Sequence, residues 1–269
     1  MHGGIIYGES VWIGCGDFDE FDDFDDFDDF DDFDKLSHRS LRVRAYMAFI
    51  ISELVAFLSE LDKNNNKAWF DVHREQYQVL RLSFADLVQD VIIGISAFDQ
   101  RAQGLAAESA MFRINRDVRF SKDKRPYKTN FSSAIGPNGR STGYPSYYFS
   151  IDHNAKLECA AGVYLPPPDL LLRIRTSIAN RPDRVADVLA NKLFAATYKT
   201  IGGDTLQRPP RGFDENTPNI DLIKHKGFTV WEERVLPPCQ STAALAKHLI
   251  KRFEAAYPLV AWLREALGA

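Results

Sequence analysis

The sequence predicts an α+β domain in which helices at both ends of the chain flank one central antiparallel sheet. Two observations carry this prediction. Apolar residues recur at helical spacing over residues 49–97 and again near the C-terminus, whereas residues 111–165 form short alternating runs separated by turn signals. Helices first, contiguous strands next and helices again are typical of an α+β domain rather than of alternating βαβ units.

The first 40 residues form a low-complexity tail and linker that precede a single domain over residues 41–269. Residues 17–34 hold twelve acidic residues, no basic residue, and a Phe at every third position. A period of three fits neither a strand nor a helix, so we expect a disordered acidic tail. This tail is either a repeat expansion or misassigned start of the reading frame, or a segment that shields the domain or recruits a partner.

The whole chain has a net charge of −4, but the acidic tail accounts for this value and the rest of the chain is basic. Thirteen of the 37 acidic residues lie within residues 1–34, which leaves 24 against 33 Lys and Arg. The remaining chain therefore carries a net charge of about +9, which is typical of a protein that meets anions.

Two helices are expected at the start of the domain. The first has an apolar stripe at positions i, i+3, i+4 and i+7, formed by Leu54, Phe57, Leu58 and Leu61. The second runs over about residues 68–97. The Asn residues at 64–66 fit a turn between the two helices and an N-terminal cap for the second.

Strands are expected next. The alternating runs cover residues 111–118, 130–135, 144–152, 157–165 and, later, 228–235. Gly136 and Gly139 frame a turn that favours a hairpin between the second and third of these strands.

Further helices are expected after the Pro run that ends the fourth strand. They cover about residues 169–179, 182–189, 242–256 and 258–267. Residues 206–217 are rich in Pro and fit an ordered loop, while residues 220–224 are ambiguous.

The densest basic segment, residues 112–128, is the candidate site for an anionic ligand. We expect Arg113, Arg116, Arg119, Lys122, Lys124 and Lys128 to supply its charge, with Arg211 from a second basic loop assisting. Guanidinium groups bind carboxylate or phosphate at two points, and ammonium groups add point charges.

Strand alternation predicts that Arg113, Asp117 and Arg119 share one face of this segment, while Arg116 lies on the other. Asp117 and Tyr127 are the candidates for acid–base catalysis should the protein be an enzyme. The structural alternative is that Asp117 neutralises the arginines and the lysines form a solvated loop.

Other polar residues carry weaker signals. Of Tyr147 and Tyr148, which face opposite ways, one is expected in the core and the other free to offer its hydroxyl to a ligand. His153 follows Asp152 at a strand end and fits solvated surface. Arg211 alternatively pairs with a nearby carboxylate in a structural loop.

The ordered motifs resemble the family called domain of unknown function 2461. They begin at Asn65 with NNKxWF, continue from Phe112 with FRIxRDxRFSKDKxPYKT, and return from Arg208 with RxPRGF and from Pro218 with PxIDLxKxKxF. The resemblance covers about residues 49–235, with His225 and Gly227 departing from it. It implies one α+β domain and no particular activity.

Several classes of function lack support. No HExxH, Cys/His spacing or nucleophile elbow is present, so neither a metal nor a cofactor is expected. The three cysteines are scattered, and no apolar run has the length of a membrane span, which favours a cytoplasmic protein, or a nuclear one in a eukaryote. The sequence therefore predicts a protein that binds an anionic small molecule or a nucleic-acid backbone. The alternatives are an enzyme acting on a phosphorylated or carboxylated substrate and a structural protein.

Overall fold

The domain is described by a computed structural model over residues 50–137, 139–140 and 143–268. Internal contacts separate residues 1–46 from residues 47–269, and every described residue belongs to the second unit. The acidic tail expected to be disordered lies outside the described residues.

The described residues form an α+β domain, which confirms the predicted fold class. The strands are β1 (Asn130–Ile135), β2 (Ser146–Asp152), β3 (Lys156–Val163) and β4 (Phe228–Val235). The α-helices are α2 (Ile50–Lys63), α3 (Lys67–Val72), α4 (Arg74–Ser96), α5 (Ala107–Ala110), α6 (Pro168–Asn180), α7 (Pro182–Ala190), α8 (Lys192–Thr197), α9 (Ile220–Ile223) and α10 (Thr242–Leu267), with a 3-10 turn η1 (Gln100–Ala102) after α4.

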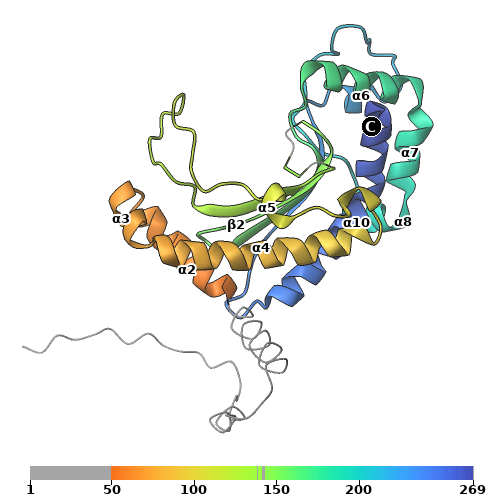
Figure 1. The fold of residues 1–269 in the computed structure, drawn as a ribbon. Coiled ribbons are helices and arrows are strands. Elements are labelled where there is room, and N and C mark those ends of the chain that lie inside the picture. The colour runs from red at the N-terminus through yellow and green to blue at the C-terminus, as the bar shows by residue number, and fades with distance from the viewer. Residues whose placement is uncertain (1–49, 138, 141–142, 269) are drawn as a thin grey trace, which may run out of the picture. The chain divides into compact units, whose positions relative to one another are not determined.

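The four strands form one antiparallel sheet in the order β1-β2-β3-β4. Alternate residues of the strands, such as Phe131, Tyr147, Phe149 and Val230, are buried on one face. Helices α4 and α10 cross beneath this face and α2 joins them at one end (Figure 1). The core therefore lies between one face of the sheet and one layer of helices.

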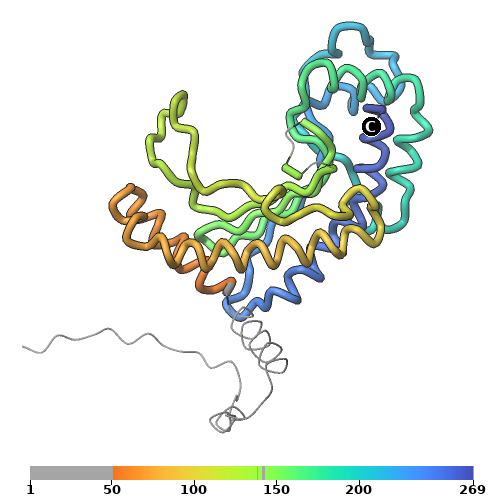
Figure 2. Tube along the Cα trace, viewed as in Figure 1, coloured from red at the N-terminus to blue at the C-terminus, as the bar shows by residue number. Residues whose placement is uncertain are grey.

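The opposite face of the sheet, called the open face below, has no long helix against it in the described part of the chain (Figures 1 and 2). Because successive side chains of a strand point to opposite faces, this face carries Ser132, Tyr148, Ser150, Glu158 and Trp231. Trp231 is exposed and Tyr148 is half-buried. This face thus carries mostly polar side chains together with the aromatic rings of Tyr148 and Trp231.

Three predictions about individual elements were wrong. The long helix expected over residues 68–97 is divided at His73, whose backbone leaves the helical region between α3 and α4. The last two predicted helices are one, because α10 continues through Pro258. Residues 111–118 form isolated bridges at Met111 and Asn115 in place of a strand.

The expected helix cap is present. The side chain of Asn66 accepts a hydrogen bond from the backbone N–H of Trp69 at 3.0 Å, as the Asn-rich turn predicts. At the other end of the chain, Gly268 ends α10 in the left-handed conformation that glycine adopts without steric cost.

A buried ionic group joins three elements on the helix side of the sheet. Asp99, which follows α4, accepts hydrogen bonds from the guanidinium of Arg264 on α10 at 2.6 Å and from the hydroxyl of Tyr147 on β2 at 2.9 Å. The side chains of Asp99 and Arg264 are 3% and 5% exposed. The three groups hold α4, β2 and α10 together because each would be costly to leave unpaired.

We expect Arg264→Leu to lower the free energy of unfolding by about 3–5 kcal/mol, because it leaves the Asp99 carboxylate buried without its cation. Urea denaturation followed by circular dichroism measures this change. The control is Arg184→Leu. Arg184 pairs with Glu265 and is more exposed than Arg264, so this change should shift the midpoint of urea unfolding little. Equal shifts for the two variants would contradict the structural role of the buried pair.

Candidate functional site

The basic segment, residues 112–128, leaves the first strand of the sheet and returns to it. Phe112 bonds to Ser132 of β1, while Arg116 bonds to Pro126 through the backbone at 2.8 Å and Lys128 to Ile114 at 2.8 Å. The two arms therefore run antiparallel, and residues 117–125 form a loop at their tip. Figures 1 and 2 show this loop projecting away from the sheet.

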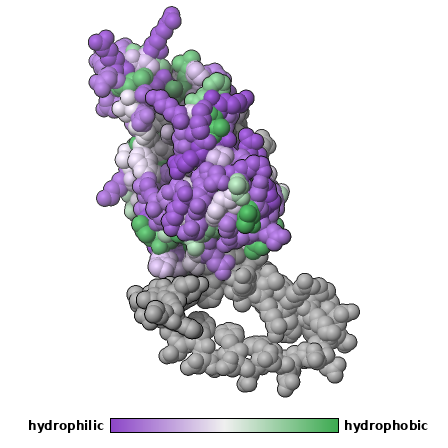
Figure 3. Space-filling model, turned by 90° about the vertical axis from the view of Figure 1, so that its left-hand side faces the viewer, coloured by the Kyte–Doolittle hydropathy of each residue, from purple (hydrophilic) through white to green (hydrophobic). Residues whose placement is uncertain are grey.

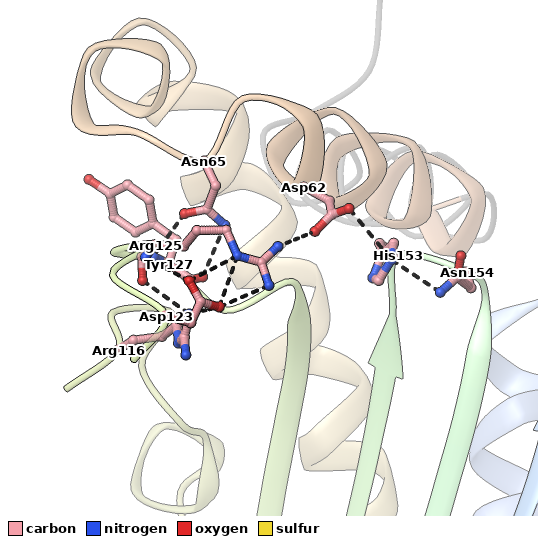
Figure 4. Close-up of polar contacts among 8 residues, drawn as sticks. All are labelled: Asp62, Asn65, Arg116, Asp123, Arg125, Tyr127, His153 and Asn154. Carbon is pink, nitrogen blue, oxygen red and sulfur yellow. Dashed lines mark hydrogen bonds and ion pairs between the residues drawn. The ribbon is translucent and has the colours of Figure 1, made fainter. Parts of the chain in front are cut away.

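The returning arm is clamped by Asn65, which lies between α2 and α3. The Asn65 side chain accepts from the backbone N–H of Tyr127 and donates to its carbonyl, both at 3.1 Å (Figure 4). The ring of Tyr127 stacks on Phe70 with 4.1 Å between centroids and is buried. The Asn65 side chain thus makes the pair of backbone hydrogen bonds that a neighbouring strand would make. Tyr127, a candidate for proton transfer, is instead packed in the core.

Two arginines of the segment are held in ion pairs. Asp123 pairs with Arg116 at 2.7 Å and with Arg125 at 3.0 Å, and Arg125 reaches Asp62 on α2 at 2.8 Å. Asp62 also lies 3.8 Å from the imidazole of His153 (Figure 4). The network ties the loop to the helix layer, so Arg116 and Arg125 position the segment more than they present free charge.

A second ion pair lies at the tip of the loop. Arg119 binds both carboxylate oxygens of Asp117, at 3.2 Å or less, and these bonds hold the pKa of Asp117 below its ordinary value. Both side chains are exposed, and Asp117 lines neither cavity described below. Arg113 adds a favourable charge to Asp117 without pairing with it.

The lysines of the loop are exposed. Lys124 donates to the backbone carbonyl of Val118 at 3.0 Å, and Lys122 forms no hydrogen bond or ion pair with any described residue. The face of the domain seen in Figure 3 is mostly hydrophilic, with small separate apolar patches. This surface suits contact with solvent or with a charged partner.

Three cationic side chains gather around Phe112, where the segment leaves the sheet, and are called the cation cluster below. They are Arg113, which follows Phe112 in the chain, Lys128 and Arg140, and the charges of both arginines act on Lys128. The amine of Lys128 lies 5.1 Å from the centre of the Phe112 ring, and Arg140 donates to the carbonyl of Met111 at 2.8 Å. No carboxylate of the described residues pairs with any of the three.

The second basic loop does not join this cluster. Arg211 is exposed and makes no hydrogen bond or ion pair with residues 112–128. Its loop precedes α9 at the opposite end of the domain from the basic segment (Figure 1). Nearby, Lys224 pairs with Glu215 at 3.1 Å, so part of this loop's charge is neutralised locally.

Two cavities lie on opposite sides of the sheet. The larger, of 600 Å³, is on the helix side, and Asp99, Tyr257 and Arg264 are among its lining residues. Asp99 and Arg264 in this lining are already bonded to each other. The smaller, of 220 Å³, is on the open face beside the start of β1 and includes Ser150 and Glu158.

Sequence reasoning missed several of the residues that shape this region. Asn65 was assigned to a turn, His153 was expected to be solvated but is half-buried, and Arg140 was not singled out. Strand alternation is a signal that could have placed Ser150 and Glu158 on one face. The expectation that Tyr147 and Tyr148 divide between core and open face is confirmed.

No group of three metal-ligating side chains occurs among the residues that the structure describes. Over the same ranges, every helix is either too short or not apolar enough to cross a membrane.

An antiparallel sheet that is covered by helices on one face, with a clamped basic segment at its edge, defines the molecule as an α+β domain. The chain belongs to the family described as conserved hypothetical protein (DUF2461), whose model matches residues 53–262. No curated protein and no solved structure matches the chain.

We expect the carboxyl group of Asp123 to titrate at about pH 2, because the backbone N–H of Arg125 and the guanidinium of Arg116 bind its ionised form. This folded-state pKa is below the unfolded value of about 3.9. The stabilisation is therefore complete above about pH 4 and is lost as the pH falls through about 2. Carboxyl carbon NMR shifts measure the midpoint.

Arg116→Leu should raise this midpoint toward the ordinary Asp value, while Arg113→Leu, a matched change outside the ion pairs, should leave it in place. An ordinary midpoint in the unmodified protein would contradict the network.

Proposed function

We propose that this protein binds an anionic group, phosphate or carboxylate, at the cation cluster of Arg113, Lys128 and Arg140. One observation carries the proposal: three cations from three chain segments gather at one place, and no described carboxylate pairs with them. Structural arginines of this domain, such as Arg116 and Arg264, are by contrast matched with acids. Unmatched charge beside an open sheet face favours a ligand of opposite sign.

The electrostatics of Lys128 support the proposal. Partial burial lowers the pKa of its ammonium group, and the charges of Arg113 and Arg140 lower it further. Folding therefore works against the charged form of Lys128. An anion between the three side chains offsets this repulsion and gains charge-assisted hydrogen bonds.

The remaining predicted cations have lesser roles in this proposal. Arg116 and Arg119 are engaged with Asp123 and Asp117, so they shape the loop. Lys122 and Lys124 extend the positive potential along an exposed rim and attract the ligand over distance. Arg211, on its separate loop, does not contact the ligand in this proposal.

Binding is favoured over catalysis by Asp117. A general base gains from a pocket and from a pKa near neutrality, whereas Asp117 is exposed, paired with Arg119, and lowered in pKa. The ligand is either a small anionic molecule or a nucleic-acid backbone. A cytoplasmic or nuclear location remains a prediction from the sequence.

We expect the double variant Arg113→Ala/Lys128→Ala to weaken the binding of inorganic pyrophosphate by about 100-fold, because each side chain contributes a charge-assisted bond worth about a factor of ten. Isothermal titration calorimetry at low salt measures the affinity. Lys247→Ala/Lys251→Ala on α10 removes the same net charge from exposed positions and is the matched control.

The control should bind pyrophosphate almost as the unmodified protein does. Equal losses in the two double variants, or no pyrophosphate binding by the unmodified protein at low salt, would contradict a site at the cluster.

A mixed-sequence oligonucleotide separates the two kinds of ligand. If the partner is a nucleic-acid backbone, affinity falls steeply with salt, since each neutralised phosphate releases counterions. Pyrophosphate binding without detectable oligonucleotide binding at low salt assigns the cluster to a small ligand.

A further inference from the structure

The 220 Å³ cavity on the open face lies next to the cation cluster. Its walls come from the start of β1, the end of β2 and the start of β3, and Thr129 on its edge directly follows Lys128 of the cluster. All of its lining side chains are polar, and the ones that carry the argument are Ser150, Asp152, His153 and Glu158. Such a lining suits a group rich in hydroxyls rather than an apolar ring.

Two polar groups of this cavity lack a hydrogen bond within the described chain, although the charge of Glu158 acts on Lys156 and Tyr148. The carboxylate of Glu158 is half-buried yet forms no hydrogen bond or ion pair. Nδ1 of His153 is buried and also without a hydrogen bond, although its Nε2 lies 3.1 Å from the amide nitrogen of Asn154. Shielded polar groups are usually satisfied, so both atoms stand out. The Glu158 carboxylate is partly exposed and can accept hydrogen bonds from a ligand, whereas Nδ1 of His153 is shielded from the cavity.

The pairing register of the strands explains why the cavity lies beside the cation cluster. Ser150 of β2 lies opposite Ser132 on one side and Glu158 on the other, so the three form one row across the open face. Tyr148, two residues before Ser150, faces the same way, and its ring meets the edge of Phe112 at 6.4 Å between centroids. Phe112 in turn lies beneath the amine of Lys128.

Tyr148 is in electrostatic contact with both ends of this row. Burial raises the pKa of its phenol, the hydroxyl of Ser150 lowers it, the charge of Glu158 raises it, and the hydroxyl of Ser132 lowers it. Phe112 and Tyr148 therefore form a short aromatic bridge between the cations and the cavity.

The two neighbouring regions have opposite charge. The cluster carries three positive charges, whereas the cavity presents Asp152 and Glu158, and its Lys156 is paired with Glu233 at 2.8 Å. Repulsion keeps an anionic group out of the cavity and directs it to the cations, while ligand hydroxyls donate to the carboxylates. A volume of 220 Å³ is below the range of about 300–1,000 Å³ for drug-sized ligands, so it suits one small polar ring.

We propose that the ligand is a phosphorylated monosaccharide or polyol, with its phosphate at Arg113, Lys128 and Arg140 and its hydroxyls bound by Ser150 and Glu158. This inference rests on the proposed function, because it requires the cluster to bind the phosphate. The cavity then supplies the selectivity that the cluster lacks. Charge alone attracts any phosphate, whereas hydroxyl groups bind only where hydrogen-bonding side chains lie at matching positions.

Calorimetry with glucose 6-phosphate, ribose 5-phosphate, inorganic phosphate and glucose tests the inference on the whole chain. At least one sugar phosphate should bind about 10-fold or more tightly than inorganic phosphate, as one or more hydrogen bonds to a charged group predict. Ser150→Ala and Glu158→Gln should reduce this advantage and leave the affinity for inorganic phosphate unchanged.

Ser146→Ala is the matched control for Ser150→Ala, because Ser146 lies on the same strand and the same face but outside the cavity. Thermal unfolding of each variant shows whether the fold is kept. Glu254→Gln, on the exposed side of α10, matches the charge lost in Glu158→Gln.

The outcomes separate the two proposals. Sugar phosphates that bind no more tightly than inorganic phosphate, or variants of Ser150 and Glu158 without effect on the difference, overturn the sugar-phosphate inference and leave the anion site intact. Glucose that binds as tightly as its phosphate also overturns it, because the cations then contribute nothing. Absence of binding by inorganic phosphate, pyrophosphate and sugar phosphates alike overturns the anion site itself.

Discussion

The one-sided covering of the sheet is the constraint on which the rest of the structure depends. Apolar residues of the core face, such as Tyr147 and Phe149, are buried by α4 and α10, and the buried Asp99–Arg264 pair fixes these helices against the strands. The strand period of two then places the intervening residues on the other side. An open face with hydroxyls, carboxylates and a neighbouring group of cations is the direct consequence of this packing.

The basic segment has a divided role, which its composition alone does not reveal. Arg116, Arg119 and Arg125 are paired with carboxylates inside the loop or on α2, so their charge is largely neutralised locally. Arg113 and Lys128 lie closer to the sheet and are unmatched. A clamp that holds the arms of the segment in place also holds these two cations beside the open face, which is the preorganisation that the proposed binding requires.

The sequence predicted the fold class and the strands over residues 130–135 and 228–235 because alternation and turn residues are local signals. It placed the candidate segment but not its ion pairs, since Asp62 is 63 residues from Arg125 and meets it only in the folded chain. It missed Arg140, whose contact with the carbonyl of Met111 likewise depends on tertiary structure. The break at His73 and the continuity of α10 through Pro258 were missed because packing overrides local preference at helix boundaries.

Amide NMR shift mapping during a pyrophosphate titration is the most direct test of the central claim that the open face binds the ligand. The account predicts that the largest shifts occur at Arg113, Lys128 and Tyr148, around the cluster and the neighbouring strand. Largest shifts around Asp99 in the 600 Å³ cavity, or around Arg211 on its separate loop, would contradict it.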